Sequence, residues 1–143
     1  MSHAYRLMAL AWLGLLLLGC ARAAGPVQRI GPNHWLRPTS KPVISSPVCH
    51  DWDGDGRLEI AIGSWDGYFY LLDDELRTLP GWPKRSPRGF PPSPALADLD
   101  GDGAPEIIVA SDAGKLHAWR ADGSNAEGWP RDLGYRSWAS AAI

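Results

Sequence analysis

Cysteine is scarce in this sequence: Cys20 and Cys49 are the only two among 143 residues. Cys20 falls in an N-terminal segment that we expect to be removed or lipidated, which leaves Cys49 without a partner in the chain. An internal disulfide framework is therefore excluded. Cys49 lies in an apolar stretch, so we expect a small buried side chain there. Something other than disulfide bonds has to stabilise the folded protein.

The net charge is small, and catalytic motifs are lacking. The 14 lysines and arginines stand against 16 aspartates and glutamates, a net charge of -2, so the composition predicts no nucleic-acid partner. The sequence contains no Gly-x-Ser-x-Gly nucleophile elbow, no catalytic triad motif and no glycine-rich phosphate-binding loop. It therefore provides no catalytic residue and no organic-cofactor site, and it favours a protein that is not an enzyme.

Long apolar runs are limited to one, at residues 7–18. Arg6 precedes this run, and the small-residue stretch 21–24 follows it, which is the pattern of a secretory signal. The run is shorter than the roughly 20 residues of a membrane span. We therefore predict a signal peptide at residues 1–24 and an exported protein that is secreted, periplasmic or anchored at the cell surface.

Two processing routes fit this segment. Residues 21–23 read Ala-Arg-Ala and match the A-x-A rule for signal peptidase. Residues 17–20, which end in Cys20, resemble a bacterial lipobox whose cysteine is acylated. The sequence leaves both routes open. In either case we expect membrane contact only through the signal or a lipid anchor.

Glycine and proline are abundant, with 16 and 13 residues, and they favour short strands joined by tight turns. Trp35, Trp82 and Trp129 recur at intervals of 47 residues, and Ser46, Ser93 and Ser140 keep the same interval. Within this frame, Ser-Pro opens a short apolar strand at 48–50 and at 95–97. Aromatic and β-branched enrichment between turns predicts further equivalent strands at 60–63 and 107–110, and at 68–72 and 115–119. A repeat of this size with three or four short strands is typical of a β-propeller blade.

The predicted fold class is thus all-β, built from β-propeller-type repeats of 47 residues. Residues 25–45 form the tail of an incomplete N-terminal repeat, 46–92 the first repeat, 93–139 the second, and 140–143 the start of a truncated third. Closed propellers typically contain about 4–8 blades. We therefore expect a fragment of a propeller, with open sheet edges that leave it marginally stable in isolation.

Each repeat contains an acidic loop, at residues 51–59 and 98–106, and both loops read D-x-D-G-D-G-x-x-E. Ca²⁺ binds 6–8 oxygen atoms, and alternate aspartates in a curled loop supply them, with a glycine at position 6 for the turn. Neither loop contains histidine or cysteine, which argues against zinc. An acidic surface turn is the alternative for a single copy, but two copies in one frame favour calcium. The candidate ligands are the carboxylates of Asp51, Asp53, Asp55, Glu59, Asp98, Asp100, Asp102 and Glu106, and the backbone carbonyls of Arg57 and Ala104.

From about Val27 onward the chain resembles the FG-GAP/VCBS repeat family of integrin α-subunits and bacterial secreted proteins. The acidic loop followed by a β-rich run carries this resemblance. It implies a calcium-binding β-propeller with the metal ligands just named. Where Gly-Ala-Pro is expected after the strand, residues 63–65 read Gly-Ser-Trp and residues 110–112 read Ala-Ser-Asp. The bacterial VCBS-like subtype is therefore the closer match.

Two functions remain open. The first is a non-enzymatic, calcium-stabilised module for extracellular recognition, adhesion or display, with an extracellular protein or glycan as partner. The second is the N-terminal part of a propeller enzyme of the polysaccharide lyase or quinone-dependent dehydrogenase type, because residues 118–123 are similar to a quinoprotein strand and turn. The recurrent tryptophans are expected to pack between blades, which leaves Trp52 and Trp65 as candidates for stacking on sugars.

Overall fold

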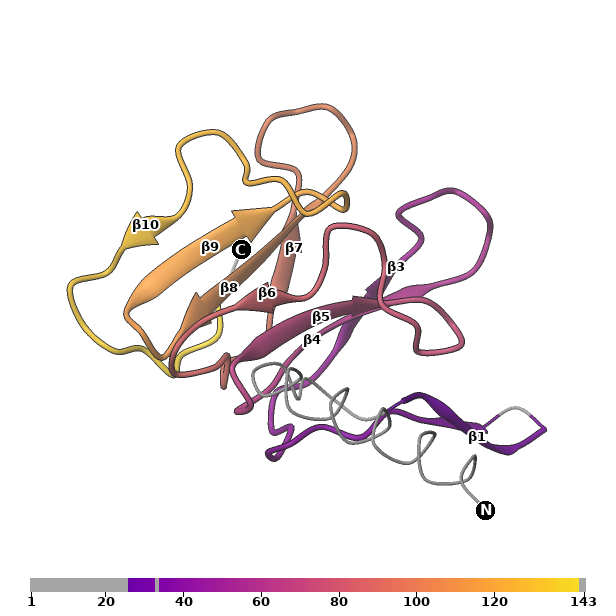
Figure 1. Ribbon diagram of the computed structural model, residues 1–143. Helices are drawn as coiled ribbons and strands as arrows, with labels where there is room; N and C mark the ends of the chain where they lie inside the picture. Colours follow the sequence, from indigo (N-terminus) through magenta and orange to yellow (C-terminus); the bar gives the residue numbers. More distant parts are fainter. Residues whose placement is uncertain (1–25, 33, 142–143) are drawn as a thin grey trace, which may run out of the picture.

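The computed structural model describes residues 26–32 and 34–141, which form strands and turns (Figure 1). The predicted all-β fold class is confirmed in this part of the chain. The predicted signal peptide, and residues 142–143 of the predicted third repeat, lie outside the described residues. Within the described ranges, no helix has the length and apolar character needed to cross a membrane.

Two antiparallel four-stranded sheets make up most of the structure, in the orders β3-β4-β5-β6 and β7-β8-β9-β10. A separate hairpin, β1-β2, precedes them. The described residues form no closed propeller. The strands are β1 Gln28–Gly31, β2 His34–Leu36, β3 Val48–His50, β4 Glu59–Gly63, β5 Tyr68–Leu72, β6 Lys84–Arg85, β7 Ala95–Ala97, β8 Glu106–Ser111, β9 Lys115–Trp119 and β10 Arg131–Asp132.

The sequence pattern explains most of these strands. The predictions for β3, β5, β7 and β9 are confirmed residue for residue, whereas β4 and β8 begin one residue earlier, at the glutamate that ends each acidic loop. The short strands β6 and β10 were not predicted individually. They contain lysine, arginine and aspartate without an apolar pattern, and pairing with the preceding strand defines them.

Hydrogen bonds between successive repeats recur with the same 47-residue spacing. The amide of Ser46 donates to Ser93 Oγ at 2.8 Å, and the amide of Ser93 donates to Ser140 Oγ at 3.1 Å. The amide of Trp65 donates to the carbonyl of Pro42, as the amide of Asp112 does to that of Gly89. The segment before the first sheet therefore contacts that sheet as the end of the first repeat contacts the second.

An apolar core joins the two sheets. The first repeat contributes Phe69 of β5 and Trp82 of the following loop, and the second contributes Trp119 of β9. The ring of Phe90 contacts those of Phe69 and Trp119. The rings of Trp82 and Trp119 meet edge to face at 5.6 Å, and Trp82 Nε1 donates to the carbonyl of Ala121 at 2.8 Å. The prediction that the recurrent tryptophans pack between repeats is confirmed for Trp82.

The other two recurrent tryptophans have different surroundings. Trp129 packs against a smaller core within the second sheet. Trp35, in β2, lies beneath the guanidinium of Arg29, whose carbon is 5.6 Å from the ring centroid. Their packing between blades stays a prediction.

The prediction that Cys49 is buried is wrong, because its side chain is exposed. Cys49 lies in β3, which pairs with β4 on one side and forms the edge of its sheet. Its apolar neighbours in the sequence alternate in direction along the strand. An apolar stretch therefore did not indicate which face Cys49 occupies.

Candidate metal centre

The two acidic loops occupy equivalent places in the two sheets. One connects β3 to β4 and the other connects β7 to β8, and both project from the same end of the molecule (Figure 1). Each loop ends at a glutamate that is the first residue of a central strand. The glutamate is thereby held by the sheet, whereas the aspartates lie in the loop.

Hydrogen bonds to the first aspartate curl each loop in the same way. Asp51 accepts the amide of Gly54 at 2.8 Å and that of Gly56 at 3.0 Å. Asp98 accepts the equivalent amides of the second loop at 2.7 and 3.0 Å. Gly56 has a φ of 84°, a left-handed conformation that glycine adopts without strain. The motif therefore specifies one loop conformation in both copies.

The glutamates are the most deeply buried members of the motif. Glu59 is 3% exposed and Glu106 is 1% exposed. Glu59 Oε2 accepts the amide of Trp52 at 2.8 Å, and Glu106 Oε2 accepts that of Leu99 at the same distance. Within the described residues Glu59 takes part in no ion pair. A buried carboxylate is costly unless a partner compensates its charge, so this position favours a cation.

Three of the four predicted carboxylates in each loop converge. Asp51, Asp53 and Glu59 each offer an oxygen atom, and these atoms lie within 4.8 Å of one another. Asp98, Asp100 and Glu106 form the equivalent group, which we call the second triad, with the first set as the first triad. Three like charges this close repel one another, and a cation between them removes that repulsion.

The fourth carboxylate of each loop lies outside the triad and contacts position 7 instead. Asp55 Oδ1 accepts the amide of Arg57 at 2.8 Å, and Asp55 Oδ2 binds the Arg57 guanidinium at 2.6 Å. The guanidinium lowers the pKa of Asp55. Asp102 accepts the amide of Ala104 at 2.8 Å. Position 5 of each loop is thus paired with position 7 of the same loop, Asp55 with Arg57 and Asp102 with Ala104.

Arg120 belongs to the second site, although the motif did not identify it. Its Nη2 donates to Asp100 Oδ2 at 2.6 Å, and its Nε lies 3.9 Å from Glu106 Oε1. This hydrogen bond lowers the pKa of Asp100. Arg120 comes 20 residues after Asp100 in the chain. The only sequence signal is in the 47-residue frame, where the first repeat has Asp73 at this position.

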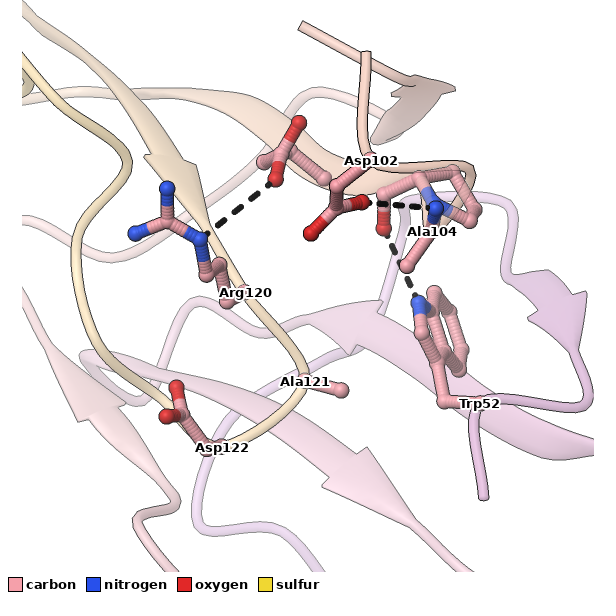
Figure 2. Close-up of a pocket in the computed structure, with 8 residues that line it drawn as sticks. Trp52, Asp102, Ala104, Arg120, Ala121 and Asp122 are labelled. Atoms are coloured by element: carbon pink, nitrogen blue, oxygen red, sulfur yellow. Dashed lines mark hydrogen bonds and ion pairs between the residues drawn. The ribbon is translucent and has the colours of Figure 1, made fainter. Parts of the chain in front are cut away.

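A cavity of about 180 Å³ adjoins the second site. Residues of both repeats line it, and Figure 2 shows Trp52 of the first loop facing Asp102 and Ala104 of the second, with Arg120 on the opposite side. Trp52 Nε1 donates to the carbonyl of Pro105 at 3.0 Å. The indole of Trp52 therefore bridges the two repeats beside the metal loop.

Trp65, the second candidate for stacking on sugars, lies in the turn between β4 and β5. Its ring meets that of Trp138 edge to face, with the centroids 5.6 Å apart. Trp138 Nε1 donates to the buried carboxylate of Asp112 at 2.8 Å, and Arg136 binds the same carboxylate. Trp65 is thus part of an aromatic pair that spans two repeats.

Sequence comparison identifies a known repeat that resembles the segment with the two acidic loops. No curated protein matches the chain. A family model described as FG-GAP-like repeat matches residues 51–109. The match begins at Asp51, the first residue of the first loop, and ends in β8 after the second loop. The segment that contains both acidic loops is thus similar to FG-GAP-like repeats.

Proposed function

We propose that each acidic loop binds one calcium ion and that the chain is a non-enzymatic, calcium-stabilised repeat module. The observation that carries this proposal is the duplicated triad, in which three carboxylates lie within 4.8 Å of one another in both repeats. An acidic surface turn has no need for a buried glutamate, yet Glu59 and Glu106 are both buried. A bound divalent cation compensates this charge.

The donor set suits calcium among the common divalent ions. All candidate side-chain ligands are carboxylates, which calcium prefers, and calcium accepts the irregular geometry of a loop. Magnesium requires a tighter octahedron and retains its waters, and zinc is typically bound through histidine or cysteine. Three carboxylates leave coordination positions for the carbonyl of Arg57 or Ala104 and for water. When bound, the ion supplies positive charge between the carboxylates.

Calcium binding is expected to stabilise the sheets as well as the loops. Glu59 and Glu106 are the first residues of β4 and β8. An ion bound by this glutamate and by the aspartates of the same loop therefore connects each loop to a central strand of its sheet. Extracellular calcium modules typically have a Kd near 10⁻⁴–10⁻³ M. At about 1 mM free calcium and a Kd of roughly 0.1 mM, each site adds about 1.4 kcal/mol to the free energy of unfolding.

Isothermal titration calorimetry on the full chain tests this proposal. We expect two calcium ions per chain, about one ion after Asp53→Asn, and about one after Asp100→Asn. Asp66→Asn serves as the control, because Asp66 lies in the turn after β4 and accepts the hydroxyl of Tyr70 there. It should leave the stoichiometry at two. Absence of binding at millimolar calcium would sink the proposal.

The biological setting that fits this module is extracellular recognition, adhesion or display, with a protein or glycan as partner. Export rests on the pattern of residues 1–24, and N-terminal sequencing of the exported product checks it: an intact Met1 would contradict export. The enzyme alternative stays a prediction. Its segment, residues 118–123, contacts the first repeat through the carbonyl of Ala121, which accepts Trp82 Nε1.

A further inference from the structure

The two metal loops share one motif, yet among the described residues a positive charge contacts the triad carboxylates of only one. In the second loop, Arg120 Nη2 lies 2.6 Å from Asp100 Oδ2, and its Nε lies 3.9 Å from Glu106 Oε1. Two of the three carboxylates of the second triad therefore already face a guanidinium. The triad and the arginine together carry two formal negative charges rather than three.

The first triad has no such neighbour. Among the described residues, Asp51, Asp53 and Glu59 form no ion pair. Arg57, the nearest arginine in the chain, binds Asp55 and Asp74, which both lie outside the triad. The first triad therefore keeps its three formal charges for an incoming cation.

We propose that Arg120 is a built-in counter-cation of the second loop, so that the first loop is the tighter calcium site and the second the weaker one. This inference rests on the proposed function. In the ion-free protein, Arg120 offsets the repulsion within the second triad. An incoming calcium ion has to displace the guanidinium from Asp100, or accept it as a like-charged neighbour. Both effects weaken calcium binding at this loop.

The surroundings of Arg120 allow this displacement. Its side chain is 37% exposed, and it borders the cavity of about 180 Å³ between the repeats. Asp122 lines the same cavity (Figure 2), and it offers a second carboxylate for the displaced guanidinium. Arg120 lies directly after β9, so its movement requires no change in the sheet.

Calcium affinity at the isolated second loop tests the proposal. In the full chain, Asp53→Asn disables the first loop, and calorimetry then reports the Kd of the second loop alone. Adding Arg120→Gln should tighten this Kd by about fivefold, because no charged pair has to be broken and no cation remains beside the ion. Arg120→Lys, which keeps the charge, should give a smaller gain.

Arg77→Gln is the matched control for net charge. Arg77 pairs with Asp73 and Glu75 on the first repeat, so it touches neither triad. In the Asp53→Asn background it should change the Kd less than about twofold through long-range charge alone. The complementary background, Asp100→Asn, reports the first loop, whose Kd should be tighter than that of the second. An equal effect of Arg120→Gln and Arg77→Gln overturns the proposal.

Melting in EDTA provides a readout that does not depend on calcium. Arg120→Gln should lower the melting temperature of the ion-free protein by about 1–3 °C, because the second triad loses its counter-cation. The difference should vanish or reverse in saturating calcium. An unchanged melting temperature in EDTA overturns the counter-cation role by itself. Failure of the proposed function is distinguishable, because it appears as absent calcium binding before Arg120 is altered.

Discussion

At the scale of single residues, equivalent positions of the two repeats hold different side chains, and these exchanges create local chemistry. Tyr70 of β5 corresponds to His117 of β9. Tyr70 donates its hydroxyl to Asp66 at 2.9 Å. His117 instead stacks on Trp119 with ring centroids 4.7 Å apart, and its Nε2 lies 3.2 Å from Ser111 Oγ. The histidine is thereby half-buried against the rings of Trp119 and Phe90.

His117 is expected to make folding sensitive to mild acid. Burial, with a smaller contribution from Lys115, lowers the pKa of His117 from 6.5 to about 4. Between these values the unfolded chain binds more protons than the folded one, so stability is complete above pH 6.5 and falls as the pH drops towards 4. One group contributes at most about 1.4 kcal/mol per pH unit.

Urea unfolding in EDTA from pH 4.5 to 7.5 measures this dependence. His117→Gln keeps a polar partner for Ser111 but does not titrate, so its unfolding free energy should fall less steeply with acid than that of the parent protein. Parallel pH profiles for the two proteins would contradict the assignment to His117.

At the scale of the strands, the close approach of the segment between β6 and β7 decides which residues fit at the end of β4. Gly63 ends β4, and a side chain there would collide with the backbone of Phe90, whose carbonyl and Cβ lie against it. The second repeat has Ala110 at the equivalent position of β8 and Ser137 in place of Phe90. The strand itself therefore accepts a side chain, and contact with Phe90 excludes one from Gly63.

Opposite exchanges at these two positions should both destabilise the protein. Gly63→Ala is expected to lower the free energy of unfolding by about 1–3 kcal/mol through overpacking. Ala110→Gly should cost about 0.5–1 kcal/mol through the added freedom of the unfolded chain. Urea denaturation measures both, and a neutral or stabilising Gly63→Ala variant would show that Phe90 yields.

At the scale of the whole molecule, the contact between repeats joins two sheets that share no backbone pairing. The apolar core of Phe69, Trp82, Phe90 and Trp119 lies at this contact, and the hydrogen bond from the Ser46 amide to Ser93 Oγ crosses it. Repeat proteins depend on such nearest-neighbour interfaces, because one repeat buries too little surface alone. Stability of this chain should therefore reside largely at the boundary between the repeats.

Two of the three recurrent tryptophans, Trp82 and Trp129, test this view. Trp82→Phe removes the donor to the carbonyl of Ala121, and we expect a loss of about 1–3 kcal/mol in the free energy of unfolding. Trp129→Phe, the matched change in the second repeat, should cost less than about 1 kcal/mol, because Trp129 lies outside the core that joins the sheets. Equal losses in chemical denaturation would refute a special role for the boundary.

The sequence by itself determined the features that depend on local pattern. The strands β3 and β7 follow from short apolar runs opened by Ser-Pro, and β5 and β9 follow from strand-forming runs between turns. The curled loops follow from Asp51 and Asp98, which bind amides within five residues of themselves. Interactions this short depend on spacing alone, and spacing is visible in the sequence.

Only the tertiary structure decided the features that join distant segments. Arg120 reaches Asp100 because β9 runs beside β8, and Trp52 contacts Pro105, 53 residues away, because the sheets lie side by side. Cys49 in β3 is exposed, whereas Leu96 at the equivalent position of β7 packs against the core between the sheets. Such contacts depend on how whole sheets pack, and the pattern of residues along the chain does not give the spatial distance between distant segments.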